Sequence, residues 1–359
     1  MQHIFLYNLL KIIYKILIEL KMLLTVGFGL MLIINWLRSV VTSLSSGHYA
    51  VTTEASLGPR HILSLSSEEK RKFLDSFDYV FSDIDGVVWV LEHDIEGAAA
   101  GFKELKAAGK KLTFITNNSI RPAKSYAQKF KALDLDVDVN EIIHPAKSIV
   151  DYLNSIKFDG LIYVIASEAF KDALRTAGYK FIDGPNKIIE ESFEVLASNV
   201  FDNQSVDAVI IDVDFNLSSM KLIRAHVYLR NPKCLLIAGA TDMLLPLRKD
   251  ASIIGPGAFA KTIAVSSKKE MITLGKPGKE LAQMLVKRFN IKDTKRVLMI
   301  GDMLDQDVGF GRECGFQTLI VLSGGCSHED LATAKFLPNY CAASMGDFVQ
   351  FMSDINKST

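Results

Sequence analysis

The sequence has few cysteines and no excess of charge of either sign. Its four cysteines include no Cys-x-x-Cys pair, and their spacings suit neither a zinc site nor a disulfide framework, so we expect buried, reduced thiols. Lysine and arginine together number 41, as do aspartate and glutamate, which gives no electrostatic reason to expect a nucleic-acid partner. The histidines are scattered without a His-Glu-x-x-His pattern, and no internal repeat is found.

The length of 359 residues exceeds what one compact core usually needs, so we expect two domains or one core with a large insert. Apolar, strand-like segments alternate with helical patterns from residue 79 onward, and a second such alternation begins near residue 161. This order favours parallel strands and right-handed crossovers, which is an α/β fold. The expected strands lie at 79–82, 111–116, 161–166, 208–213, 234–238, 296–300 and 318–322. The expected helices lie at 98–108, 125–133, 168–177, 218–230, 258–265 and 281–289.

The N-terminal residues differ from the rest of the chain. Residues 22–37 carry no charge, but as a helix they would span only about 24 Å, short of a hydrocarbon core of roughly 30 Å. Three interpretations stay open: a signal anchor, an interfacial amphipathic helix, or an uncleaved extension. A segment rich in serine, glycine and threonine follows at 42–58 and is typical of a linker. We expect a cytoplasmic protein, with membrane association through residues 12–37 as the alternative.

Two carboxylates, Asp83 and Asp85, follow directly after the apolar segment at 79–82. Residues two apart in a strand point to the same side, so both would lie at the carboxyl end of the strand, where open α/β sheets bind ligands. Carboxylates this close repel each other unless a cation or a shared proton neutralises them. We therefore predict a magnesium-assisted site with one nucleophilic aspartate and one acid–base aspartate.

Two other segments could bind a phosphate group at the same site. Thr116, Asn117 and Asn118 end the strand at 111–116, where a hydroxyl and backbone N–H groups can hold phosphate oxygens. Lys276 lies between a glycine and a proline, and its ammonium would offset the charge of the nucleophile and of the phosphate.

A fourth segment supplies more carboxylates at the end of another apolar strand. Asp302 follows Gly301 there and is suited to bind a hard cation through oxygen. Asp305 or Asp307 would orient bound water from behind the metal ligands, and we favour Asp307 for that part.

These four segments, in this order, are the four motifs of the haloacid dehalogenase-like phosphatase superfamily, which the chain resembles over roughly residues 60–350. Within it, the chain is most similar to the p-nitrophenylphosphatase-like group, which includes phosphoglycolate phosphatase and pyridoxal phosphate phosphatase (chronophin). The resemblance is carried by His61-Ile-Leu, Asp83-x-Asp-Gly-Val-Val-Trp89, Thr116-Asn-Asn-Ser119, Gly275-Lys-Pro277 and Gly301-Asp-x-Leu-Asp-x-Asp307.

The resemblance implies a Rossmann-like core with a parallel sheet, and an α/β cap of the C2 type inserted between the second and third motifs. We therefore expect a hydrophobic extension and linker at 1–56, a core formed by 57–155 and 255–359, and a cap at 156–254. It also implies a homodimer formed through the cap.

The resemblance also implies the chemistry. Asp83 would attack phosphorus and form an aspartyl-phosphate, while Asp85 would protonate the leaving oxygen and then activate water. The side chain of Asp83, the backbone carbonyl of Asp85 and Asp302 would hold Mg²⁺. The segment Thr116–Asn118 and Lys276 would bind the phosphoryl group.

Three positions depart from the pattern of the group. Met303 stands where an arginine is usual in the fourth motif, Gly239-Ala240 where the cap often has Thr-Asn, and Phe259 where a turn usually has a small residue. None removes a catalytic atom, but the last two lie where cap and core meet and bear on the substrate and the rate.

Three further polar or aromatic residues have simpler interpretations. We expect His144 to be structural and Trp89 to pack in the core. Asp242 would either touch the substrate or lie in a solvated loop.

We predict a magnesium-dependent hydrolase of small phosphomonoesters, similar to p-nitrophenylphosphatase or phosphoglycolate phosphatase. One alternative is a phosphatase directed at pyridoxal phosphate or phosphotyrosine. Another is a catalytically weak paralogue that acts as a binding module. A true dehalogenase would not need Asp85.

Overall fold

The computed structural model describes residues 58–248 and 251–357. The predicted extension at 1–56, with its apolar stretch at 12–37, lies outside the described residues. Among the helices that the structure describes, none is both long and apolar enough to cross a bilayer.

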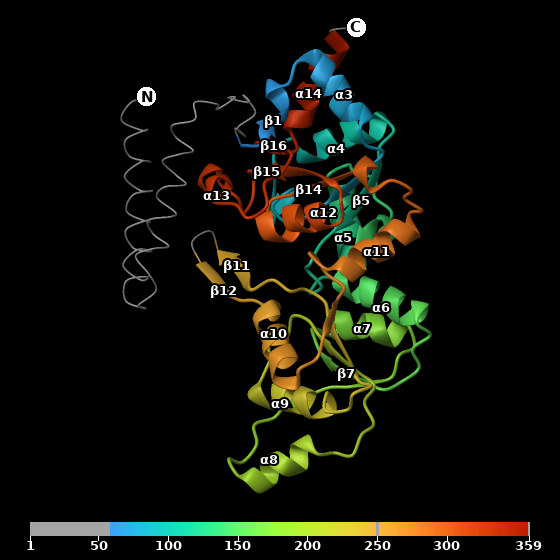
Figure 1. The fold of residues 1–359 in the computed structure, drawn as a ribbon, viewed down its shortest axis with the longest axis vertical. Coiled ribbons are helices and arrows are strands. Elements are labelled where there is room, and N and C mark those ends of the chain that lie inside the picture. Colours follow the sequence, from blue (N-terminus) through green and yellow to red (C-terminus); the bar gives the residue numbers. More distant parts are fainter. Residues whose placement is uncertain (1–57, 249–250, 358–359) are drawn as a thin grey trace, which may run out of the picture. The chain divides into compact units, whose positions relative to one another are not determined.

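The larger sheet contains seven strands, and all of them pair in parallel (Figure 1). In spatial order they are β1 (Arg60–His61), β16 (Tyr340–Ala342), β15 (Gln317–Val321), β14 (Val297–Gly301), β2 (Tyr79–Ser82), β5 (Lys111–Ile115) and β6 (Ile142–Ile143). The α/β fold with a parallel sheet, predicted from the alternation of segments, is confirmed.

Successive residues of the central strands enter two different cores, as the period of a strand requires. Val80 packs in the first core and Phe81 in the second. The first core includes side chains of α3 (Ser67–Asp75), α4 (Ala98–Ala107), α5 (Ala123–Ala132) and α14 (Asp347–Lys357). The second includes side chains of α11 (Lys279–Arg288) and α12 (Gly309–Glu313). Helices therefore cover both faces of the sheet.

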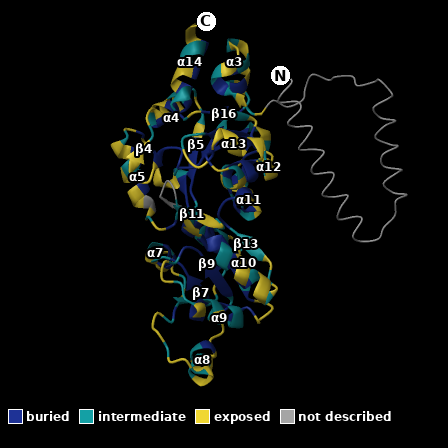
Figure 2. Cartoon of the chain, turned by 90° about the vertical axis from the view of Figure 1, so that its left-hand side faces the viewer, coloured by how far each residue is buried: buried dark blue, intermediate teal, exposed yellow. Residues whose placement is uncertain are grey.

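A second sheet of five parallel strands follows the same plan. Its order is β13 (Met271–Thr273), β10 (Leu235–Ala238), β9 (Ala208–Ile211), β7 (Ile162–Ile165) and β8 (Phe181–Ile182). One face packs on α6 (Pro145–Ser155) and α7 (Glu168–Thr176), and the other on α9 (Ser219–Tyr228) and α10 (Pro256–Ser267). The strands β7 and β9 are buried between these helices (Figure 2).

The second sheet and its helices use more of the chain than the predicted insert of 156–254. The helix α6 lies before residue 156, yet Ile149 and Leu153 pack against strand β7 of this sheet. The strand β13 lies after residue 254, yet it forms an edge of the same sheet. We therefore propose a cap of residues 144–273, with 58–143 and 274–357 as the core.

Two antiparallel hairpins and several short elements complete the described fold. One hairpin joins β3 (Trp89–Val90) to β4 (His93–Asp94), and the other joins β11 (Leu244–Arg248) to β12 (Ala251–Ile254). The remaining elements are the helices α8 (Phe193–Val200) and α13 (His328–Ala332), and the short turns η1 (Ile62–Ser64), η2 (Val139–Glu141), η3 (Thr294–Arg296) and η4 (Leu304–Val308).

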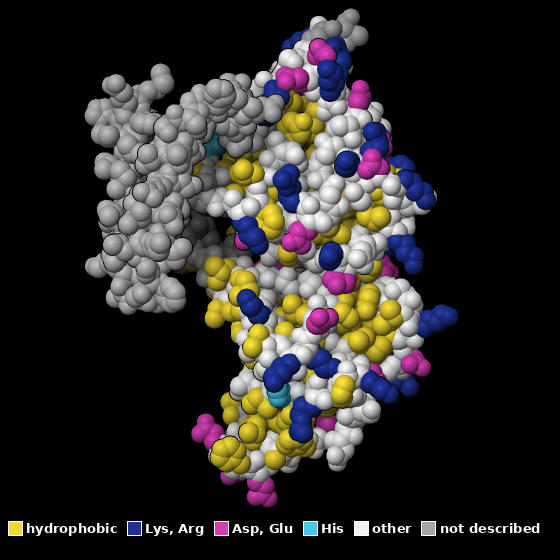
Figure 3. All heavy atoms as spheres, in the orientation of Figure 1, with side chains coloured by type: hydrophobic (Ala, Val, Ile, Leu, Met, Phe, Trp, Pro, Cys, Tyr) yellow, Lys and Arg dark blue, Asp and Glu magenta, His cyan; other side chains and the backbone are white. Residues whose placement is uncertain are grey.

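The surface and the thiols agree with the composition. Positive and negative side chains are interspersed on the face in Figure 3, without a field of one sign. All four cysteines are free, and three of them, Cys234, Cys326 and Cys341, are buried. The prediction of reduced thiols is therefore confirmed.

Candidate active site

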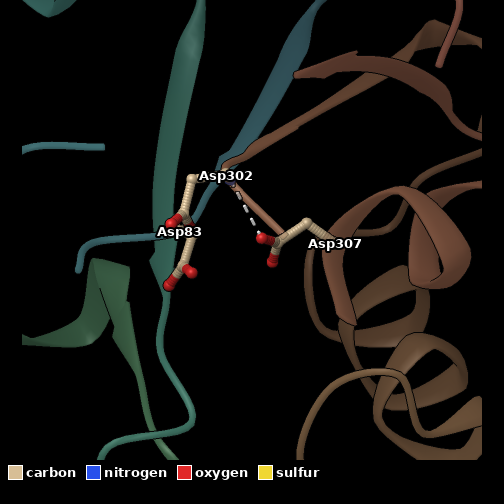
Figure 4. A group of neighbouring side chains, drawn as sticks. All are labelled: Asp83, Asp302 and Asp307. Atoms are coloured by element: carbon tan, nitrogen blue, oxygen red, sulfur yellow. Dashed lines mark hydrogen bonds between the residues drawn. The ribbon is translucent and has the colours of Figure 1, made fainter. Parts of the chain in front are cut away.

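Three aspartates meet at the carboxyl end of the larger sheet. The pairing of Ser82 with Ile300 places Asp83 beside Asp302, and the N–H of Asp83 donates to the carbonyl of Ile300 at 2.8 Å. Carboxylate oxygens of Asp83, Asp302 and Asp307 all lie within 4.8 Å of one another. In Figure 4, Asp83 and Asp302 lie at the ends of neighbouring strands, and Asp307 reaches them from a helical turn.

The Asp302 carboxylate fits closely between backbone segments. A Cβ atom at Gly86 or at Gly324 would lie 2.1 Å from Oδ2 of Asp302, so both positions need glycine. The N–H of Gly325 donates to that oxygen at 2.6 Å. The other oxygen, Oδ1, is buried and has no hydrogen-bond partner among the described residues. Burial and the neighbouring Asp307 raise the pKa of Asp302 to about 7.

Asp307, which we predict to lie behind the metal ligands, has a carboxylate in this cluster. It lies on η4, is fully buried, and receives hydrogen bonds at Oδ2 from the N–H groups of Asp302 and Met303, at 3.1 and 3.0 Å. Because Met303 contributes its backbone here, the departure from the family pattern at this side chain removes no bond. Asp305 is exposed.

Lys276 is the counter-charge of the cluster. Its side chain is buried, and Nζ lies 2.8 Å from Oδ1 of Asp83 and 2.7 Å from Oδ1 of Asp307. Asp307 and Asp83 raise the pKa of Lys276 above its ordinary value despite its burial. Burial raises the pKa of Asp83 well above its ordinary value, against the effect of Lys276.

The residues present fit a hard divalent cation. Three buried carboxylates face a single ammonium, so the cluster keeps an excess of negative charge when all four groups are ionised. Its donor atoms are oxygens, and one of them, Oδ1 of Asp302, is buried without a partner. Oxygen-only sites of this kind are typical of Mg²⁺.

The carboxylate of Asp85 is held by two neighbours. Trp89 Nε1 donates to its Oδ1 at 3.1 Å, and the hydroxyl of Thr116 donates to its Oδ2 at 3.4 Å. Trp89 is fully buried, as predicted, but it also holds the candidate acid, and we had missed this role. The signal was its place in the motif, four residues after Asp85.

The loop after β5 lies beside these groups, but the side chain of Asn117 is already engaged. Its Oδ1 accepts from the N–H of Lys276 at 2.7 Å, and its Nδ2 donates at 2.9 Å to the carbonyl of Lys276 and to Asp242. Only its backbone is left to meet a phosphate. Asn118 donates its N–H to the Thr116 hydroxyl at 3.0 Å, which fixes the turn.

The remaining candidates have structural environments. The side chain of Asp242 is partly buried and bonded to Asn117, so it does not lie in a solvated loop. His144 is buried, and burial lowers its pKa to about 4, as suits a structural histidine. Phe259 packs against the core of the cap.

Comparison with known proteins agrees with this arrangement. A family model described as haloacid dehalogenase-like hydrolase matches residues 80–180, and one described as HAD-hydrolase-like matches residues 273–348. The chain is 32% identical to phosphoglycolate phosphatase 1A, chloroplastic, of Arabidopsis thaliana, covering 83% of each protein. It is 30% identical to glycerol-3-phosphate phosphatase of Gallus gallus, covering 84% of this chain and 100% of that protein.

Solved structures share the fold. The 4-nitrophenylphosphatase of Thermotoga maritima superposes with a TM-score of 0.64 at 23% identity, over 77% of this chain and 98% of that one. A glycerol phosphate phosphatase of Mycobacterium tuberculosis, solved in complex with magnesium, superposes with a TM-score of 0.61 at 22% identity, over 77% of each chain.

The predicted localisation is corrected by these findings. The cytoplasmic assignment is withdrawn, because the names of two relatives, phosphoglycolate phosphatases 1A and 1B of Arabidopsis thaliana, place those proteins in chloroplasts. The membrane-associated alternative concerns residues 12–37, which lie outside the described residues. In 58–248 and 251–357, no helix is long and apolar enough to span a bilayer.

The identity to curated phosphatases over most of their length, the two family matches and the shared fold lead to one conclusion. This chain belongs to the haloacid dehalogenase-like hydrolases and is a phosphoric monoester hydrolase.

Proposed function

We propose that the protein hydrolyses small phosphorylated metabolites with Mg²⁺ and through a phosphoaspartate formed on Asp83. The observation that carries the proposal is the placement of Asp83. Its Oδ1 is held by the N–H of Ile84 at 2.7 Å and by Lys276 at 2.8 Å, next to two more buried carboxylates. This fixes the direction of the side chain before any substrate arrives.

The cation would be held by the side chains of Asp83, Asp302 and Asp307, and the backbone carbonyl of Asp85 stays a predicted ligand. Haloacid dehalogenase-like phosphatases generally use Mg²⁺. When bound, the ion neutralises charge on the phosphate and the carboxylates and aligns the groups for in-line attack.

Asp83 supplies the nucleophile. Because Oδ1 accepts two hydrogen bonds, the lone pairs of Oδ2 are those directed at phosphorus. A bond forms between this oxygen and phosphorus as the ester P–O bond breaks, and water later attacks phosphorus to release phosphate and restore the carboxylate. Lys276 remains protonated and offsets charge on the attacking carboxylate.

Asp85 moves the protons. In the first step it gives a proton to the leaving oxygen, and in the second it takes one from the attacking water. The bonds from Trp89 and Thr116 hold its carboxyl group in one orientation for both steps. In the turn Thr116–Asn118, the N–H of Asn117 would bind a phosphoryl oxygen, because those of Thr116 and Asn118 donate to the carbonyl of Ile143 and to the hydroxyl of Thr116.

The substrate class follows from the relatives. The relatives of 30% and 32% identity described above are named for phosphoglycolate and glycerol 3-phosphate, which are short phosphorylated chains without a ring. We propose substrates of this size for the present chain. Pyridoxal phosphate is the second candidate, because chronophin of Rattus norvegicus is 28% identical over 80% of this chain.

The test is hydrolysis of p-nitrophenyl phosphate by the full chain, with Mg²⁺ and with EDTA, followed by phosphoglycolate, glycerol 3-phosphate and pyridoxal phosphate at equal concentration. We expect turnover only with Mg²⁺ and the highest kcat/KM for one of the two short substrates. Asp83→Asn should abolish turnover without changing the circular dichroism spectrum. Full activity of this variant would refute the assignment of the nucleophile, and the absence of turnover by the wild type would favour the binding-module alternative.

A further inference from the structure

One buried carboxylate of the cap lies outside the site described so far and joins the cap to the core. Asp212 follows strand β9 and is only 2% exposed. Its Oδ1 accepts from the hydroxyl of Ser119 and from the N–H of Val213, the latter at 2.6 Å. Its Oδ2 accepts from the N–H of Ala240 at 2.9 Å. Two of these three donors belong to the cap, and Ser119 belongs to the core.

The hydroxyl and the carbonyl of Ser119 are both hydrogen-bonded to the cap. Its hydroxyl donates to Asp212, and its carbonyl accepts from the hydroxyl of Ser167 at 3.3 Å, the residue that caps α7. The side chain itself is buried. Ser119 ends the turn that begins at Thr116, so the segment proposed to bind phosphate is the segment that contacts the cap.

The structure around Asp212 leaves room for glycine alone at position 239. A Cβ atom there would lie 1.8 Å from Oδ2 of Asp212 and 2.8 Å from Cβ of Pro145. The carboxylate therefore occupies the space that a side chain at 239 would need. This accounts for Gly239-Ala240, where the family group often has Thr-Asn: Gly239 makes room for Asp212, and Ala240 binds it through the backbone.

Burial and the nearby carboxylate of Asp242 both make it costly to ionise Asp212. Burial raises the pKa of Asp212 to about 6, against the three hydrogen bonds, and Asp242 adds to the increase. A carboxylate is costly to bury, and in some proteins such a group fixes the geometry of the contact that it makes.

We propose that Asp212 is a positioning residue, which holds the segment Thr116–Ser119 against the cap and so sets the phosphate-binding turn and the cap in one relative position. The role rests on the proposed function, since the turn is the part that would bind the phosphoryl group. Asp212 touches no reacting atom. It acts through Ser119, whose hydroxyl is its single bond to the core among the contacts of the described residues.

The first experiment is a double-mutant cycle in the full-length chain. Asp212→Asn replaces the carboxylate by an amide, which has one acceptor oxygen and one NH₂ group. Because three donors converge on this side chain, one donor would then face the NH₂ group and lose its acceptor. Ser119→Ala removes the bond from the core side and tests the same link with a smaller change. We expect each variant to lose about tenfold in kcat/KM for p-nitrophenyl phosphate, and the double variant to lose no more than either single one.

Asp214→Asn is the matched control. Asp214 also follows β9, and its Oδ2 lies 2.7 Å from Nζ of Lys221, with side chains 8% and 4% exposed. This ion pair lies entirely within the cap, so its loss should lower the melting temperature and leave kcat/KM unchanged. If Asp212→Asn behaves like Asp214→Asn, the carboxylate only stabilises the cap, and the proposal is overturned.

The second experiment needs no turnover. Hydrogen exchange of the amides of Asn118 and Ile120, both bonded within the turn, should accelerate several-fold in Asp212→Asn and Ser119→Ala, and not in Asp214→Asn. Unchanged exchange together with additive kinetic losses refutes the link. A wild type without phosphatase activity would refute the proposed function alone, since faster exchange in these two variants would still establish how the turn is held.

Discussion

Lys276 and Asp307 form a buried ion pair, with Nζ 2.7 Å from Oδ1, at the centre of the acidic cluster. The same ammonium also reaches Oδ1 of Asp83 at 2.8 Å, so one cation serves two carboxylates. Removing one partner of a buried pair leaves an uncompensated charge, which usually costs about 3–5 kcal/mol. The pair therefore bears on stability as well as on catalysis.

Replacing Lys276 by methionine should lower both activity and stability. The side chain keeps its length, but the three carboxylates lose their counter-charge and Asp83 loses a hydrogen bond. We expect kcat/KM to fall by at least about a hundredfold and the free energy of unfolding to fall by about 3 kcal/mol. Steady-state kinetics and urea denaturation measure the two effects.

Lys171→Met provides the comparison for this variant. Lys171 is a buried lysine of the cap, paired with Asp183 at 2.6 Å and Glu168 at 2.7 Å. Its loss should destabilise the fold while the folded protein keeps its kcat/KM. Equal kinetic losses in the two variants would mean that Lys276 acts only through stability.

Asp302→Asn should weaken the response of the protein to Mg²⁺. A ligand present at a hundred times its dissociation constant stabilises the folded state by about 2.7 kcal/mol, so Mg²⁺ should raise the melting temperature of the wild type. The variant has lost one of three carboxylates and should need at least tenfold more Mg²⁺ for half of this effect. Differential scanning fluorimetry with increasing MgCl₂ measures both. The exposed Asp305, replaced by Asn, should behave like the wild type.

The proximity of Asp83 and Asp302 could be predicted because each ends an apolar strand, and parallel strands end at the same edge of a sheet. The position of Asp307 beside them could not, because it lies on a π-helical turn, where residues are not spaced as in an α-helix or a strand. No pattern in the chain marks such a turn.

The features that were missed depend on contacts between distant segments. Residues 208–213 were predicted as one strand, but the strand ends at Ile211, and Asp212 turns to bind Ser119 in the core. Likewise, the helical pattern of α6 and the apolar pattern of β13 do not indicate which of the two sheets they join. Both fall within the ranges predicted for the core, and both pack with the five-stranded sheet.

The stability of the protein should depend on pH through Asp212. Its pKa rises from 3.8 to about 6 on folding, so the folded chain binds a proton more tightly than the unfolded chain. This contribution is fully present below roughly pH 4 and is lost as the pH rises through about 6, and a change of this size corresponds to about 3 kcal/mol.

The variant Asp212→Asn isolates this effect, because every other titrating group is common to both proteins. We expect the free energy of unfolding of the wild type, minus that of the variant, to decrease between about pH 4 and pH 7. Urea denaturation at four pH values in the presence of EDTA measures the difference. A difference that does not change with pH would mean that folding does not raise the pKa of Asp212.

Trp89→Phe should affect substrates according to their leaving groups. Phenylalanine keeps an aromatic ring between Tyr126 and Phe130, whose centroids lie 6.3 and 5.1 Å from that of Trp89, but it lacks the N–H that donates to Asp85 at 3.1 Å. The acid then loses one of its two orienting bonds. Since p-nitrophenolate leaves without needing a proton, its release should change little, whereas an alkyl phosphate such as glycerol 3-phosphate needs the proton and should lose about tenfold in kcat/KM. The measurement is the ratio of the two kcat/KM values, which leave out the later attack of water that both substrates share. Asp85→Asn should shift this ratio in the same direction and further. An equal loss for both substrates would show that Trp89 supports the fold of the site and not the proton transfer, because a displaced nucleophile would slow both reactions alike.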